Sequence, residues 1–95
     1  ADMVPVLLQV VHEDAGHELS PHHDRPDWSA VVSVTLTGST TFIIDGDQQV
    51  HAEGGTAWCL CDTGQHSFPY NTQHGHGVLS SPRTAVVLRF RERPH

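Results

Sequence analysis

The chain has 95 residues, enough for one small domain over residues 1–95 and too few for a second. It carries 5 Arg and no Lys against 11 acidic residues, and the net charge of −6 argues against tight non-specific binding to a nucleic-acid backbone. No apolar run approaches the roughly 18 residues of a membrane span, so no membrane partner is expected. The chain starts at Ala1 rather than Met, which predicts a piece of a longer protein.

Short β-rich runs separated by turn residues follow one another along the chain, with no amphipathic helix pattern between them. The run over 30–37 alternates between two faces, and Asp45-Gly46 is a strong hairpin signal. Strands are expected over 4–11, 19–24, 30–37, 40–44, 48–52, 56–61, 78–79 and 84–90, with a long polar loop over 62–75. About eight short strands with frequent turns predict an all-β jelly roll.

His22 and Asp24 are two positions apart in an extended stretch, so their side chains point to the same side and His23 points to the other. An imidazole and a carboxylate are two parts of the 2-His-1-carboxylate site, which leaves three positions on Fe(II) open. A polar turn is the alternative, because His, Asp and Pro are common in turns. The candidates for a third ligand are His76, His66 and His74, of which the two at 74 and 76 share a face.

Two arginines project from one face of the last expected strand. Arg83 and Arg89 are six residues apart, and Ala85 and Val87 lie between them on that face. The guanidinium group is the preferred fork for a carboxylate, so the pair could lean inward to hold one small anion. A charged edge strand is the alternative interpretation.

The two cysteines, Cys59 and Cys61, share one face of an expected strand. Their spacing lies at the edge of disulfide range. We interpret them as small apolar residues in a reducing compartment, which predicts a cytoplasmic protein.

These features, taken in order, resemble the AlkB-type Fe(II)/2-oxoglutarate oxygenases, and most of all the short domains embedded in plant RNA virus replicases. The resemblance covers roughly residues 6–91. It rests on the run Ser20-Pro21-His22-His23-Asp24, the segment VVSVTLTG over 31–38 with Thr41-Phe42, the segment His76-Gly77-Val78, and Arg83 with Arg89 and Phe90-Arg91.

The resemblance implies a double-stranded β-helix that lacks the N-terminal lid of that family. The implied iron ligands are His22, Asp24 and His76. Arg83 would bind the distal carboxylate of the cosubstrate 2-oxoglutarate, Arg89 would lie near its metal-bound end, and His12 stands in the place of a family tyrosine that helps hold it. The implied enzyme is a 2-oxoglutarate-dependent dioxygenase that uses O₂ to demethylate N-methylated nucleobases, in RNA or in DNA.

A cupin-like metal protein is the alternative. Gly16, followed after five residues by His22-His23-Asp24, resembles the first cupin motif with Asp in place of its second His. Gly64-Gln65-His66 with Asn71 partly resembles the second motif, which makes His66 the third ligand beside His22 and Asp24. This alternative predicts an isomerase, a dioxygenase that needs no 2-oxoglutarate, or a metal- or ligand-binding domain. The oligomeric state stays open, because an all-β domain of this size could bury a sheet edge against a second copy.

Overall fold

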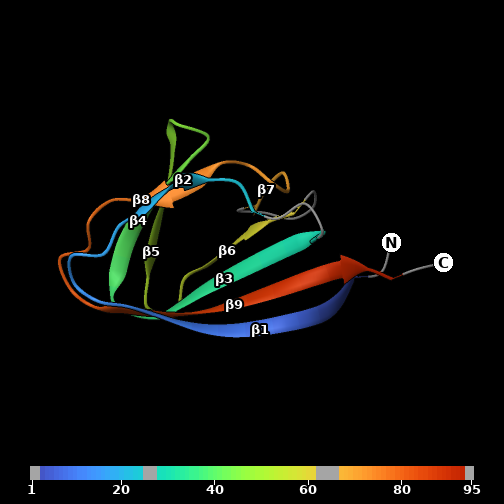
Figure 1. The fold of residues 1–95 in the computed structure, drawn as a ribbon, viewed down its shortest axis with the longest axis horizontal. Helices are drawn as coiled ribbons and strands as arrows, with labels where there is room; N and C mark the ends of the chain where they lie inside the picture. The colour runs from blue at the N-terminus through green and yellow to red at the C-terminus, as the bar shows by residue number, and fades with distance from the viewer. Residues whose placement is uncertain (1–2, 25–27, 62–66, 94–95) are drawn as a thin grey trace.

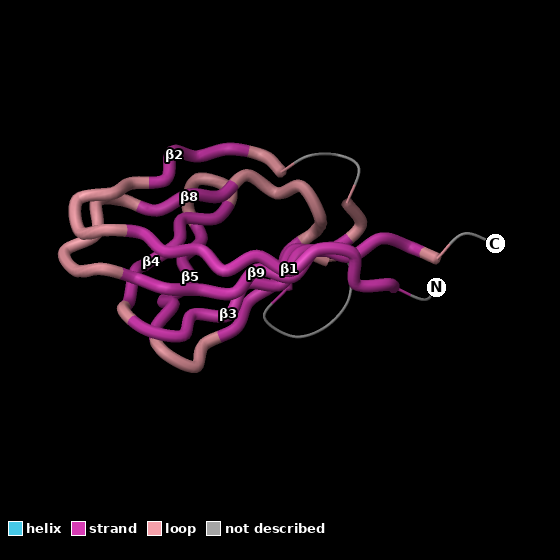
Figure 2. Tube along the Cα trace, turned by 60° about the horizontal axis from the view of Figure 1, so that its bottom comes forward, coloured by secondary structure: helices cyan, strands magenta, loops and turns pink. Residues whose placement is uncertain are grey.

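The computed structural model describes residues 3–24, 28–61 and 67–93, which form strands and loops (Figures 1 and 2). The strands are β1 (Met3–Glu13), β2 (Leu19–His22), β3 (Ala30–Thr37), β4 (Ser39–Ile44), β5 (Gln48–Glu53), β6 (Ala57–Leu60), β7 (Ser67–Phe68), β8 (His74–His76) and β9 (Arg83–Glu92). Within these ranges there is no helix of the length and apolarity that a membrane span needs. The all-β prediction is confirmed.

The strands form two sheets that face each other, and strands distant in the sequence lie side by side (Figure 1). The five-stranded sheet has the order β1-β9-β3-β6-β7, and the four-stranded sheet has the order β2-β8-β4-β5. The first and last strands are antiparallel partners over almost their whole length. Two antiparallel sheets with these long-range pairings make a small jelly roll, as predicted.

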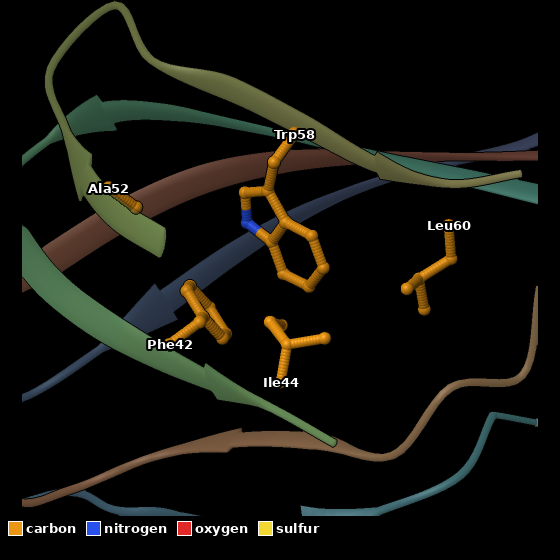
Figure 3. Packing of buried hydrophobic residues seen from close by; sticks show 5 residues of the cluster. All are labelled: Phe42, Ile44, Ala52, Trp58 and Leu60. Atoms are coloured by element: carbon orange, nitrogen blue, oxygen red, sulfur yellow. The ribbon is translucent and has the colours of Figure 1, made fainter. Parts of the chain in front are cut away.

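The main hydrophobic cluster lies between the sheets near the β4–β5 hairpin (Figure 3). Phe42 and Ile44 of β4 point at Trp58 and Leu60 of β6, and Ala52 of β5 closes one side. Ile44 and Leu60 have exposed fractions of 0% and 1%, so each contributes roughly 1.5–3 kcal/mol through burial. This cluster holds β4 and β6 together and thereby fixes one wall of the space between the sheets.

The predicted hairpin at Asp45-Gly46 is present between β4 and β5. Asp45 has φ of 53° and Gly46 has φ of 85°, and both values lie in the left-handed region. Two consecutive residues with positive φ are typical of the type I′ turn, whose twist matches that of the flanking strands.

Two expectations about secondary structure are wrong. The segment 78–79 is not a strand, because the main chain of Leu79 makes two isolated hydrogen bonds: its N–H donates to His17 O (2.9 Å), and its carbonyl accepts from Gly16 N–H (2.8 Å). The expected loop over 62–75 contains β7 and the beginning of β8. The sequence His-Gly-His of β8 lacks an apolar pattern, so only its pairing with β2 and β4 makes it a strand.

Candidate metal centre

A cavity of about 420 Å³ lies between the two sheets and receives side chains from both. Its walls are largely apolar, and polar side chains gather in two groups. The apolar lining residues include Val11, Leu19, Val31, Phe42, Trp58, Leu60, Ala85 and Val87, and the polar lining residues are His12, Glu13, His17, His22, Asp24, Ser33, His74, Arg83 and Arg89.

The first polar group consists of His22, Asp24 and His74, which we call the metal cluster. One potential ligand atom from each residue lies within 4.8 Å of the other two. Oδ1 of Asp24 is 3.8 Å from Nε2 of His22 and 3.9 Å from Nε2 of His74. These separations are too long for hydrogen bonds. Three ligand atoms that face one another across such a gap are a candidate site for a cation.

The donor atoms of the metal cluster suit a divalent transition-metal ion. Zinc–ligand distances of about 2.0–2.2 Å place two tetrahedral ligands roughly 3.4 Å apart, so the two gaps between Asp24 and the histidines would each close by about half an ångström around such an ion. Imidazole and carboxylate donors suit zinc, iron, nickel and copper. The residues present therefore fit a metal, with coordination positions left for a small molecule.

Hydrogen bonds to main-chain carbonyls set the tautomer of both histidines. Nδ1 of His22 donates to Ser20 O (2.9 Å), and Nδ1 of His74 donates to Thr72 O (3.1 Å). A carbonyl oxygen only accepts, so Nδ1 carries the hydrogen and the lone pair of Nε2 faces Asp24. Outer hydrogen bonds of this kind orient metal-binding histidines in proteins.

Strand pairing brings the two histidines together. His22 of β2 is the register partner of His74 of β8, and their ring centroids are 4.4 Å apart. Gly75 permits this pairing, because a Cβ at this position would contact the Leu19 carbonyl oxygen and lie 2.8 Å from the Pro21 nitrogen. A side chain at position 75 would therefore separate β8 from β2.

Burial differs within the metal cluster. The side chains of Asp24 and His74 are 9% and 8% exposed, whereas that of His22 is 38% exposed. Burial lowers the pKa of His74, although the hydrogen bond to the Thr72 carbonyl and the charge of Asp24 act in the opposite direction. A lowered pKa keeps this imidazole neutral near pH 7, which is the form that binds a metal. The exposed side of His22 provides access from solvent.

The second polar group of the cavity wall is Glu13, His17 and Arg83. The buried residues His76 and Thr35 join it, and we call these five residues the ion-pair cluster. One oxygen of Glu13 accepts from Nε2 of His76 (2.7 Å), and the other accepts from Arg83 (2.8 Å). Arg83 also donates to the hydroxyl of Thr35 (2.9 Å). Nε2 of His17 lies 3.3 Å from the His76-bound oxygen. These contacts pair the Glu13 carboxylate on both oxygens, whereas Nε of Arg83 is buried without a hydrogen-bond partner among the described residues.

Apart from His17, whose side chain is 50% exposed, the ion-pair cluster is buried, and its charges lower the pKa of Glu13. The side chains of Glu13, His76 and Arg83 are 8%, 0% and 3% exposed. Burial by itself would raise the pKa of Glu13, but the hydrogen bonds and positive charges of His76 and Arg83 outweigh it and lower that pKa. Glu13 is therefore a stable carboxylate in the folded protein.

The structure places the expected third ligand away from the metal cluster. His76 donates through Nε2 to Glu13, and its Nδ1 lies 2.7 Å from Gly77 O, so neither ring nitrogen faces Asp24. His74, two residues earlier, faces Asp24 instead. His66 of the cupin alternative lies outside the described residues. His23 is not part of the metal cluster, and its Nδ1 donates to Asn71 O (2.7 Å).

The two arginines have different surroundings. Both line the cavity. The guanidinium group of Arg83 donates hydrogen bonds to Glu13 and Thr35. In Arg89, Nη1 lies 3.9 Å from Oδ2 of Asp24, and Nε donates to Gln9 (3.1 Å). Arg89 therefore stands beside the metal cluster with guanidinium hydrogens directed at the cavity. The imidazole of His12, at the cavity rim, is hydrogen-bonded to Thr84 (3.0 Å) and lies 3.3 Å from Asp14.

A turn signal before β8 distinguishes His74 from His76. Thr72 N–H donates to the Pro69 carbonyl (3.2 Å), and the Thr72 hydroxyl also donates to it (2.6 Å). Asn71 within this turn has φ of 68°. Asn tolerates the left-handed conformation that turns require, and a turn over 69–72 would have predicted a strand that begins near position 74. That start would have favoured His74 as the partner of His22.

Comparisons with solved structures identify the fold. The DMSP lyase DddQ from Ruegeria pomeroyi matches 93% of this chain at 20% identity and a TM-score of 0.68, and the structure titled DMSP lyases RdDddP and RnDddQII matches 90% at 18% and 0.66. A cupin protein from Bacteroides fragilis matches 93% at 12% identity and 0.64. The chain covers 70% of that cupin but 39% and 37% of the two lyase structures.

Searches by sequence add no family. A scan against protein-family models finds no match to this chain, and a search of curated proteins finds none either. At the identities given above, the structural likeness shows a shared cupin-type jelly roll. It supports the cupin alternative better than the AlkB-type resemblance.

Proposed function

We propose that this protein is a cupin-like metalloprotein in which His22, Asp24 and His74 hold a divalent transition-metal ion at the wall of the cavity. The observation that carries the proposal is the geometry of the metal cluster: two Nε2 atoms, each with its tautomer set by a carbonyl, lie 3.8 and 3.9 Å from one Asp24 oxygen. When bound, the ion would act as a Lewis acid toward a small molecule in its open positions.

The cavity suggests a small anionic substrate with an apolar part. Arg89 lies beside Asp24 and can form two parallel hydrogen bonds with a carboxylate. Leu19, Phe42 and Trp58 line the cavity and exclude water from the apolar part. The DMSP lyases among the solved structures are enzymes with this fold, which supports an enzymatic role for the cavity.

Metal titration of the chelator-treated protein tests the proposal. Addition of Mn(II), Ni(II), Zn(II) or anaerobic Fe(II) should raise the melting temperature, because a ligand of the native state stabilises it by roughly 2.7 kcal/mol at 100 times its Kd. His74→Ala should abolish the metal-dependent shift. His76→Ala should lower the melting temperature without metal and still show the shift. Loss of the shift in His76→Ala and its retention in His74→Ala would contradict the proposed ligand set.

A 2-oxoglutarate-dependent dioxygenase is the second candidate, and the position of Arg89 favours it. A keto acid bound to Fe(II) would place a carboxylate near Asp24, within reach of this side chain. The predicted role of Arg83 is harder to accommodate, because its guanidinium group would have to leave the buried Glu13. The predicted cosubstrates Fe(II), 2-oxoglutarate and O₂, and the methylated RNA or DNA substrate, stay predictions.

The two candidates differ in their response to the keto acid. With Mn(II) bound, 2-oxoglutarate should raise the melting temperature further only if the oxygenase candidate is correct, and the shift should disappear in Arg89→Met. Conversion of 2-oxoglutarate to succinate by the Fe(II)-loaded protein would then establish turnover. A metal-dependent shift without a 2-oxoglutarate shift favours the cupin-like metalloprotein.

A further inference from the structure

The two cysteines of the chain lie behind the cavity wall that β6 provides. Trp58 and Leu60 of β6 line the cavity and point into the space between the sheets (Figure 3). Successive side chains of a strand point to opposite faces, so Cys59 points outward. Cys61 follows the last residue of β6, and its Sγ atom lies 3.1 Å from Sγ of Cys59 on that outer side. Both cysteines are half-buried, which leaves them accessible to a small reagent.

The two sulfur atoms are closer than the spacing of the residues in the sequence requires. Cα atoms two positions apart in an extended strand are separated by about 6.6 Å. The chain bends at Cys61, where β6 has ended, so this residue is not held in the extended geometry of the strand. At 3.1 Å the sulfurs are in direct contact. A further approach of about 1 Å would give the length of a disulfide bond.

The spacing of the two thiols fits a disulfide better than a metal site. Zinc–sulfur distances of about 2.3 Å place two tetrahedral thiolates roughly 3.8 Å apart, so the sulfurs would have to separate to hold such an ion. A zinc ion also needs further ligands. Among the described residues, the only group of three potential ligands that lie close enough together is the metal cluster, so the thiols have no third ligand there.

The contact between the thiols assigns them different roles. Burial, the hydrogen bond to Cys61 and the negative charge of Cys61 raise the pKa of Cys59 to about 11. That charge acts only once Cys61 has ionised, so Cys61 loses its proton first and Cys59 donates its own to the thiolate. The thiolate is the attacking form of a cysteine. Cys61 is therefore the attacking residue, and Cys59 is the residue that completes the disulfide.

We propose that Cys59 and Cys61 form a redox-active pair, which hydrogen peroxide converts to a disulfide. The Cys61 thiolate attacks one peroxide oxygen, the O–O bond breaks, hydroxide leaves, and Cys61 becomes a sulfenic acid. The sulfur of Cys59 then attacks the sulfur of Cys61 and displaces its hydroxyl group, which leaves as water with the proton of Cys59. The two sulfurs lose two electrons in total. Peroxide takes up these electrons and the two thiol protons and becomes two molecules of water.

The disulfide changes the cavity wall, because Leu60 lies between the two cysteines. The Cα atoms of a disulfide are usually about 5.5–6 Å apart, so bond formation draws positions 59 and 61 together and contracts the end of β6. Leu60 is 1% exposed and belongs to the main hydrophobic cluster, where close packing transmits such a displacement. A disulfide that distorts its strand is also reduced easily by thiols, so the reaction is reversible.

Mass spectrometry of the peroxide-treated wild type tests the proposal. The chain has 2 cysteines, so a monomer that has lost about 2 Da and takes up no alkylating reagent carries the bond between Cys59 and Cys61. Dithiothreitol should restore two alkylatable thiols. A wild type that keeps both thiols, or that gains oxygen as sulfinic acid without losing about 2 Da, would overturn the proposal.

A double variant separates the geometry at Cys61 from the mere spacing of the cysteines. Ala57→Cys combined with Cys61→Ser keeps two thiols two positions apart on the outer face, but places both within β6. The disulfide should form at least about tenfold more slowly than in wild type, because the extended strand holds the sulfurs further apart. Circular dichroism checks that the variant is folded. Equal rates in the two proteins would overturn the proposal.

Two single variants test the order of attack. Cys59→Ser retains the attacking thiol, and Cys61→Ser retains the buried one. Dimedone, which traps sulfenic acids, should label peroxide-treated Cys59→Ser at least about tenfold faster than Cys61→Ser. The reverse order would overturn the assigned roles.

NMR spectroscopy of amide groups tests the effect on the cavity wall without any metal. Oxidation of the wild type should shift the amide resonances of Trp58 and Leu60, whereas that of Gly46 in the β4–β5 hairpin should stay in place. An unmoved Leu60 resonance would overturn the link between the disulfide and the cavity. Protection of both thiols from alkylation by Zn(II) in His74→Ala would overturn the redox assignment in favour of a metal site.

Discussion

The metal cluster lines the same cavity as Glu13, His17 and Arg83 of the ion-pair cluster, and both clusters contain a carboxylate and imidazoles, yet the distances between their side chains differ. In the ion-pair cluster, Glu13 accepts hydrogen bonds from His76 and Arg83 at 2.7 and 2.8 Å. In the metal cluster, Asp24 faces two imidazoles across gaps of 3.8 and 3.9 Å. Composition alone does not separate a ligand site from a structural network. The distances between the side chains separate them, and so do the partners of the ring nitrogens. In His22 and His74, Nδ1 donates to a main-chain carbonyl and Nε2 faces Asp24 across a gap, whereas Nε2 of His76 is hydrogen-bonded to Glu13.

The difference has a simple physical origin. Arg83 supplies the ion-pair cluster with a cation of its own, so Glu13 is neutralised without a metal. Among the described residues, the arginine beside Asp24 is Arg89, whose Nη1 is 3.9 Å away and whose side chain is 21% exposed. A metal ion between the two imidazoles would give Asp24 the close partner that Glu13 already has.

The largest predicted effect is on stability at the ion-pair cluster. Arg83→Met should lower the free energy of unfolding by about 3–5 kcal/mol, because it leaves a buried carboxylate without its cation. Urea denaturation measures the change. Arg83→Met combined with Glu13→Leu should recover part of the loss, since neither member of the Arg83–Glu13 pair is then left without the other. A loss below about 1 kcal/mol in Arg83→Met would mean that the pair is not buried as described.

The next effect is on metal affinity. His74→Ala should weaken binding of Zn(II) at least about 100-fold, more than the 10- to 100-fold typical of residues that only support a ligand. His76→Ala, two residues away on the same strand, should change the affinity less than about threefold. Isothermal titration calorimetry with a competing chelator measures both variants. Equal losses in the two would show that His76 also contributes to the site.

A smaller effect on the same affinity follows from the contact between β8 and β2. Gly75→Ala should weaken metal binding roughly tenfold, because the added methyl group would meet the main chain at Leu19 and Pro21 and move His74 from His22. Gly77→Ala is the matched control, since a Cβ there meets no atom within 4 Å. If both glycine variants bind metal as wild type does, the close approach of the strands is not required.

The smallest predicted effect concerns pH. The pKa of Glu13 is lower in the folded state than in the unfolded chain, so its stabilisation is complete above the unfolded value of about 4.3. It is lost as the pH falls through the folded value, because the unfolded chain takes up the proton first. Glu13→Gln should flatten the decline in stability between about pH 5 and 3. Replacement of Glu18, an exposed carboxylate, by Gln should leave the decline as it is in wild type.

The fold could be predicted because its signals are local. The alternation over 30–37 gives β3 its bounds, and Asp45-Gly46 gives the β4–β5 hairpin. The position of β8 could not be predicted in this way, because Gly75 and its flanking histidines have neither alternation nor β-propensity. Only the pairing with β2 and β4 makes this segment a strand.

The candidate site was predictable in part for the same reason. His22 and Asp24 are two positions apart in the sequence, so a local rule brings their side chains to one side. The choice of His74 depends on the register between β2 and β8, which is a long-range property. The partner of Arg83 is Glu13, 70 residues away, and no pattern in the last strand reveals it.

Anomalous diffraction from crystals grown with Mn(II) tests the central claim most directly. We predict a single strong peak between His22, Asp24 and His74, within about 2.0–2.3 Å of Nε2 of each histidine and of a carboxylate oxygen. Glu13 should keep its hydrogen bonds to His76 and Arg83 in the same crystals. A peak among Glu13, His17 and His76, with none at Asp24, would contradict the account.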